Sequence, residues 1–170
     1  TFLASARRSY LELLFSALDL PIRPNYWDFQ TKLTHQLNKK TTLSFLAIAA
    51  IDEFSFAKIK DATPEKLYIL NSNPIINQWT YTGGLSLKKL IRDGFINLAL
   101  SRNSFDNHID RYEDNELKLT SQQTLAYQSR ETENRCRLDV NLNKKGWKIA
   151  YGAVIQLAEY DNNTFNVLRK

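Results

Sequence analysis

The amino-acid sequence predicts an α+β fold, in which N-terminal helices pack on a curved C-terminal antiparallel β-sheet. Hydrophobic residues recur mainly at helical spacing over 1–103, whereas over 104–170 they alternate with polar residues, as in half-buried strands. Helices that come before strands, instead of alternating with them, favour α+β over a parallel α/β arrangement. Because 43% of the 170 residues are hydrophobic, we expect a single domain over 1–170.

Two helices are expected at the N-terminus. Over 3–18, apolar residues lie at helical spacing, with arginine and glutamate on the opposite side. Pro21 and Pro24 end this helix, since proline cannot continue a helical hydrogen-bond ladder. Asn25 is a suitable capping residue for a second helix over 26–37. We expect the two helices to form a core-packing pair.

The segment 42–59 fits two kinds of element. Leu43, Phe45 and Ala47 alternate with their neighbours as in a strand, whereas other apolar residues of the segment recur at helical spacing. Its length and alanine content favour the helix.

Two further helices complete the helical part. Thr63 and Pro64 are a capping residue and a first-turn proline, and Pro74 forbids continuation of the short helix that they begin. The next helix is expected over 87–100. Gly94 lies inside it and predicts a close helix contact or a kink there.

The C-terminal part contains the clearest local signal, an antiparallel hairpin. Residues 136–142 and 147–157 both alternate with period two, and the polar turn 143–146 between them ends in glycine. The second strand carries small residues in its middle, which predicts a central position in the sheet and close packing at Gly152. A last short strand is expected over 164–168.

The end of this hairpin resembles NTF2-like domains. The resemblance rests on 146–149 (Gly-Trp-Lys-Ile) and 152–154 (Gly-Ala-Val), which are similar to the pattern of the last long strands in that superfamily. It implies helices that precede a strongly curved antiparallel sheet, with a cone-shaped pocket between them. Such pockets serve catalysis in some members and binding or assembly in many. The resemblance assigns no functional residue of this chain.

An acidic segment is the first candidate site. Asp106, His108 and Asp110 alternate, so on an extended segment they would point to one side and could hold a divalent cation or stand at the mouth of a pocket. Arg111 and Leu117 replace the glycine and glutamate that an EF-hand loop requires at these positions. We therefore interpret the segment as a solvated acidic loop, and we expect no metal and no cofactor.

Basic residues around the hairpin form the second candidate site, a surface for an anion or a partner. The chain has a net charge of +5, divided almost evenly between 1–85 and 86–170, so no basic tail or arginine-rich helix marks it as nucleic-acid binding. The alternative interpretation is that these charges keep the sheet soluble and prevent edge pairing. The residues are Arg130, Arg135, Arg137, Lys144, Lys145 and Lys148.

Further limits come from single residues. Cys136 is the only cysteine, which excludes an internal disulfide and a cysteine-based zinc site and fits either redox compartment. The chain begins at Thr1 and contains no methionine, so we expect a fragment of a larger protein. The longest uninterrupted apolar run, 45–51, is far too short to cross a bilayer, so we expect no transmembrane segment within these residues.

These observations favour a non-catalytic binding or assembly domain that interacts with a protein partner, with a homo-oligomer as one form of such assembly. The first alternative is an enzyme or small-ligand binder with a pocket between helices and sheet. The second is nucleic-acid binding through the basic hairpin.

Overall fold

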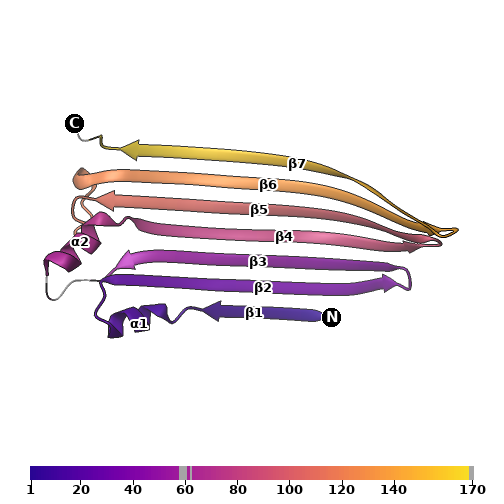
Figure 1. The fold of residues 1–170 in the computed structure, drawn as a ribbon, viewed down its shortest axis with the longest axis horizontal. Helices are drawn as coiled ribbons and strands as arrows, with labels where there is room; N and C mark the ends of the chain where they lie inside the picture. Colours follow the sequence, from indigo (N-terminus) through magenta and orange to yellow (C-terminus); the bar gives the residue numbers. More distant parts are fainter. Residues whose placement is uncertain (58–60, 62, 169–170) are drawn as a thin grey trace.

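The protein is an open antiparallel sheet of seven strands, which follow one another in sequence order from β1 to β7 (Figure 1). The computed structural model describes residues 1–57, 61 and 63–168. The strands are β1 (Phe2–Arg8), β2 (Ile22–Asn38), β3 (Thr41–Phe56), β4 (Ile75–Ile91), β5 (Gly94–Tyr112), β6 (Gln123–Lys144) and β7 (Trp147–Asn166). Two short helices, α1 (Leu11–Ala17) and α2 (Pro64–Ser72), and one turn of 3₁₀-helix, η1 (Thr120–Gln122), connect strands.

Three tight turns lie together at one end of the sheet, and the connections that contain α1, α2 and η1 lie at the other (Figure 1). The turns are 39–40 between β2 and β3, 92–93 between β4 and β5, and 145–146 between β6 and β7. Lys145 and Gly146 have φ angles of 51° and 83°. Positive φ at both central residues matches the right-handed twist of the flanking strands, so this turn suits a hairpin.

The strand register divides the side chains into two faces. Face A carries the even-numbered residues of β1, β5 and β6 and the odd-numbered residues of β2, β3, β4 and β7; face B carries the others. Face A contains an uninterrupted uncharged region, which we call the apolar band. The apolar band consists of the face-A residues within 2–6, 27–33, 43–51, 79–87, 96–100, 136–142 and 147–157.

No second layer covers the apolar band within the described part of the chain. Many of its side chains are consequently exposed, for example Trp147 at 75% and Ile155 at 65%. Among described residues, the buried hydrophobic side chains are Leu70, Ile75 and Val140; the first two lie at the α2 end of the sheet, and Val140 belongs to the band. A sheet with one solvated polar face normally packs its apolar face on something else.

The predicted fold class was therefore wrong. Segments 26–37 and 87–100 are mostly strand, and 3–18 is divided between β1 and the helix α1. Neither helix covers a face of the sheet, so the pocket expected from the NTF2-like resemblance is not formed by the described residues. The strand interpretation of 42–59 was correct for 42–56, and 58–59 lie outside the described residues. The predicted start at Thr63 is confirmed, because its hydroxyl accepts a hydrogen bond from the backbone N–H of Lys66.

The hairpin prediction is confirmed, but its place in the sheet was wrong. The strand 147–157 belongs to β7, which is an edge strand and not a central one. The separate strand predicted over 164–168 is the end of the same β7, without an intervening turn. Close packing at Gly152 is confirmed, since a Cβ atom there would lie 2.4 Å from the Leu138 carbonyl oxygen.

Candidate functional site

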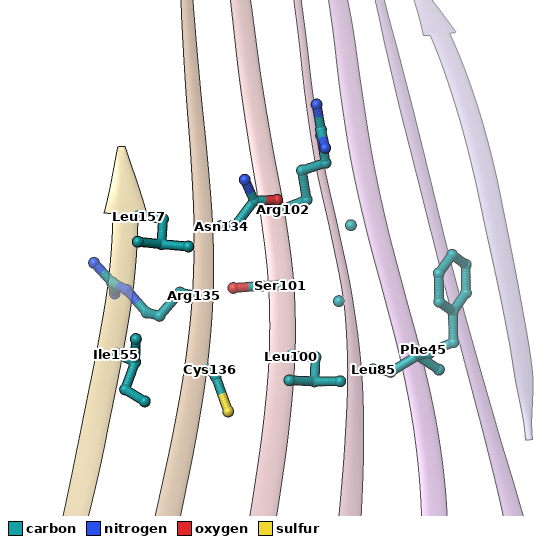
Figure 2. Close-up of a pocket in the computed structure, with 12 residues that line it drawn as sticks. Phe45, Leu85, Leu100, Ser101, Arg102, Asn134, Arg135, Cys136, Ile155 and Leu157 are labelled. Atoms are coloured by element: carbon teal, nitrogen blue, oxygen red, sulfur yellow. The ribbon is translucent and has the colours of Figure 1, made fainter. Parts of the chain in front are cut away.

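A shallow hollow of about 470 Å³ lies in the apolar band, and glycine produces it. Gly83 has no side chain, and nothing lies within 4 Å of the place that a Cβ would take. Figure 2 shows Leu100, Cys136 and Ile155 side by side on β5, β6 and β7, with Phe45 on the opposite side of the hollow. Apolar side chains form most of its wall, and Ser101, Arg102, Asn134 and Arg135 add polar groups, so the hollow offers mainly van der Waals contact with some hydrogen bonding.

The predicted acidic site, Asp106, His108 and Asp110, lies in the middle of a strand and not in a loop. All three residues are on face A of β5, as their alternation indicated. Asp106 is only 2% exposed, and each of its two carboxylate oxygens contacts a side-chain nitrogen. Oδ2 accepts a hydrogen bond from Nε of Arg130 at 2.9 Å and lies 2.8 Å from Nη2 of the same arginine as an ion pair, and Oδ1 lies 2.9 Å from Nε2 of His108.

This arrangement explains why a strand accepts an acidic cluster. Arg130 lies opposite Asp106 in the register of β5 and β6, so the pair is a cross-strand ion pair that neutralises a buried charge. Asp110 accepts a hydrogen bond from the Gln123 side chain at 2.9 Å. Among the described residues, no group of three or more His, Cys, Asp or Glu side chains is arranged to hold a metal ion. The cluster fits a structural role.

The predicted basic surface divides into two parts. Three of its members are paired with neighbouring carboxylates: Arg130 with Asp106, Arg135 with Glu133 at 3.1 Å, and Arg137 with Asp139 at 2.8 Å. The other three, Lys144, Lys145 and Lys148, lie at the turn end of the sheet.

The two other turns place more basic residues beside these lysines. The segments 38–41, 88–94 and 143–148 form the turn end, which we call the basic end. It carries eight basic residues and one acidic residue, Asp93. The basic residues are Lys39, Lys40, Lys88, Lys89, Arg92, Lys144, Lys145 and Lys148. Sequence reasoning missed this cluster because the turn 92–93 was assigned to the interior of a helix.

Shifted pKa values occur on β3, β5, β6 and β7 and do not converge on one place. Burial, followed by the negative charge of Asp28, raises the pKa of Asp52. A hydrogen bond with Ser129, followed by one with Tyr160, lowers the pKa of Tyr127. Asp52 lies on β3 and the tyrosines on β6 and β7, with two strands between them. They do not form an acid–base pair.

The comparisons with known proteins add no relative. No family model matches this chain, and no match was found among curated proteins or solved structures. Neither helix of the described residues is long and apolar enough to cross a membrane. The function is therefore argued from the surface of the sheet.

The outer edge of β7 is the second prominent feature of that surface. All 20 residues of β7 are exposed, and the strand pairs with β6 on one side only. The two-residue turn makes Lys144 and Trp147 a hydrogen-bonded pair. It follows that odd-numbered residues of β7 bond β6, whereas even-numbered residues direct their backbone N–H and C=O groups outward.

Proposed function

We propose that this chain is a non-catalytic assembly domain, which pairs with a strand of a protein partner along the outer edge of β7. The observation that supports the proposal is the length of this edge, 20 residues in regular register with β6. An edge strand presents a row of unpaired backbone donors and acceptors, and an added strand satisfies them.

The middle of β7 lacks the sequence features that normally prevent an edge strand from pairing with another chain. Charged residues, proline and bulges block edge pairing in soluble sheets. Between Ile149 and Ala158, β7 contains no charged residue and no proline, and its register with β6 contains no bulge. The other edge strand, β1, has only seven residues and ends in two arginines. The β7 edge is thus the better candidate for pairing.

The enzymatic alternative has less support. It requires a reactive group at Asp106, His108 or Asp110, but both Asp106 oxygens are already bonded to protein side chains and Asp110 accepts from Gln123. An open sheet with an unprotected edge favours assembly over turnover.

Proline substitutions on β7 test the proposal, because adjacent residues bond opposite sides. Val154→Pro removes an outward N–H and leaves the ladder with β6 complete, since proline is tolerated on the solvent side of an edge strand. Ile155→Pro is the matched control, because it removes an N–H that bonds β6. The purified chain supplies its own partner strand as a second copy, and a nonionic detergent covers the apolar band so that only edge pairing is measured.

We expect the wild type to form dimers or larger assemblies in sedimentation equilibrium, with slow hydrogen exchange at even-numbered β7 amides. Val154→Pro should be monomeric with an intact sheet, whereas Ile155→Pro should lose protection between β6 and β7. A wild type that stays monomeric with fast-exchanging even-numbered amides would contradict the proposal. So would a Val154→Pro variant that assembles like the wild type.

A further inference from the structure

The apolar band runs obliquely across the strands. Register places Leu33 of β2 in one row with Ile155 of β7. The band ends at Leu33 on β2 toward the basic end, but on β7 it continues eight residues further, to Trp147. At the limit far from the basic end, the band reaches Trp27 on β2. The β7 residue in the same row as Trp27 is Asp161, which lies outside the band, because the band on β7 begins only at Leu157. Both limits therefore shift in the same direction.

The slope can be worked out from the register. Eight residues along a strand are about 26 Å and five strand spacings are about 24 Å, which gives an angle near 45° at the basic limit. The shift of four residues at the other limit gives roughly 30° by the same spacings. Both limits slope in the same direction, so the band crosses tilted strands; it is longest on β7, with eleven residues, and shortens to five on β5, where Arg102 follows Leu100 on face A.

On three of the strands, the length of the band agrees with the hydrocarbon thickness of a lipid bilayer. Strands β3 and β4 each cross the band with nine residues, 43–51 and 79–87, and β7 with eleven, 147–157. A strand within bilayer hydrocarbon needs about 9–11 residues when it is tilted near 45°. Each strand supplies only alternate residues to the band, so a search for an uninterrupted apolar run does not detect it.

Aromatic residues mark both limits. Trp27 and Phe29 stack on β2 with ring centroids 6.0 Å apart, and Trp79 and Tyr81 stack on β4 at 5.8 Å, at the limit far from the turns. Trp147 lies at the other limit, beside the turn 145–146. Tryptophan and tyrosine concentrate where bilayer hydrocarbon meets the headgroups.

Charge complementarity indicates what lies beyond the band. The basic end, with eight basic residues against one acidic residue, directly follows the basic limit of the band. Lysine and arginine next to an apolar membrane-facing surface attract anionic headgroups. Face B carries more polar side chains, with pairs such as Thr82–Asn103 and Glu133–Gln156, beside apolar residues such as Ile48. It therefore suits water or polar protein.

We propose that the apolar band lies against the hydrocarbon of an anionic lipid bilayer, with the basic end at its headgroups. A second copy or another protein is less suited, because neither accounts for the basic end beside the band or for the aromatic residues at both of its limits. The inference rests on the proposed function in one respect: backbone groups at the edge of a sheet must be paired inside hydrocarbon, and strand addition at β7 does this.

Two leucines on neighbouring central strands test the bilayer contact. Leu85 of β4 lies in the band and is 47% exposed, whereas Leu46 of β3 lies on face B and is 50% exposed. Leu85→Asp and Leu46→Asp therefore make the same substitution at similarly exposed positions, and neither places a charge on the β7 edge. Binding is measured by flotation with phosphatidylcholine vesicles, with and without phosphatidylglycerol. All three tryptophans lie on face A, so quenching by brominated phosphatidylcholine reports their contact with hydrocarbon.

We expect binding to vesicles that contain phosphatidylglycerol, weaker binding to phosphatidylcholine alone, and quenched tryptophan emission. Leu85→Asp should weaken binding by about tenfold or more, because a charge within hydrocarbon is costly, and Leu46→Asp should bind nearly as the wild type does. Equal effects of the two substitutions, unquenched tryptophans, or no vesicle binding would overturn the inference. The Val154→Pro experiment in detergent reports on edge pairing alone, so failure of the proposed function is distinguishable from failure of the bilayer contact.

Discussion

Gly152 offers the sharpest stability test of the β6–β7 pairing. In Gly152→Ala, the added methyl carbon would lie 2.4 Å from the Leu138 carbonyl oxygen and 3.4 Å from the Asp139 Cα atom. Both obstacles are backbone atoms of β6, so relief requires the two strands to separate. Overpacking of this kind destabilises the folded state by about 1–3 kcal/mol. The loss of glycine's conformational freedom in the unfolded chain offsets about 0.4–1 kcal/mol of this. We expect a net loss of roughly 0.5–2 kcal/mol in the free energy of unfolding.

Gly83→Ala is the matched control, because nothing lies within 4 Å of the new methyl group. It should raise the free energy of unfolding by about 0.4–1 kcal/mol. Urea unfolding in nonionic detergent, followed by tryptophan fluorescence, measures both variants; with slopes of about 1–3 kcal/mol/M, the midpoints should move in opposite directions. A Gly152→Ala midpoint equal to or above that of Gly83→Ala would refute the close approach of β6 and β7.

Two further predictions concern the polar side chains of Asn115 and Asp52. The Asn115 side chain is 1% exposed and donates to the carbonyl oxygens of Leu70 and Asn73 at 2.6 and 2.9 Å, so Asn115→Ala should cost about 2–4 kcal/mol in thermal unfolding; an unchanged melting temperature would contradict this. Burial and Asp28 raise the pKa of Asp52 above the unfolded value of 3.8, so ionisation of this carboxyl lowers the free energy of unfolding. This destabilisation is absent below pH 3.8 and reaches its full size above the folded pKa. Asp52→Asn should therefore melt higher than the wild type at pH 7 and alike at pH 3, and an equal difference at both values would refute this sign.

The sequence was informative where local chemistry decides the structure. Lys145 and Gly146 adopt a turn that few other residues allow, and Thr63 caps α2 with its own hydroxyl, so both features could be predicted. The segment 42–59 was different. Face A of β3 is apolar at Leu43 and Phe45, but Leu46 and Ile48 on face B are apolar as well, and this removes the alternation that distinguishes a strand from a helix.

The turn between β4 and β5 was missed for a related reason. Leu90 and Ile91 precede it and Phe95 and Ile96 follow it, so the apolar residues repeat at helical spacing across the turn. Only Gly94 indicated an interruption, and it was interpreted as a kink.

The candidate sites depended on this fold assignment. The shared face of Asp106, His108 and Asp110 followed from alternation alone, and the structure agrees. Their pairing partners did not, because Arg130 comes from another strand, 24 residues along the chain. Likewise, the basic end and the apolar band exist only once three hairpin turns are brought to the same end of the sheet. No local pattern contains that information.

The strand order has a consequence for how the chain acquires its structure. Each strand pairs only with its neighbours in sequence, so no segment has to wait for a distant part of the chain before it can form a ladder. Pairing can zip outward from the turns at 39–40, 92–93 and 145–146, and such local nucleation shortens the search that slows other all-β proteins. The same order would let further hairpins add beside β7 and widen the sheet, without rearranging any strand already in place.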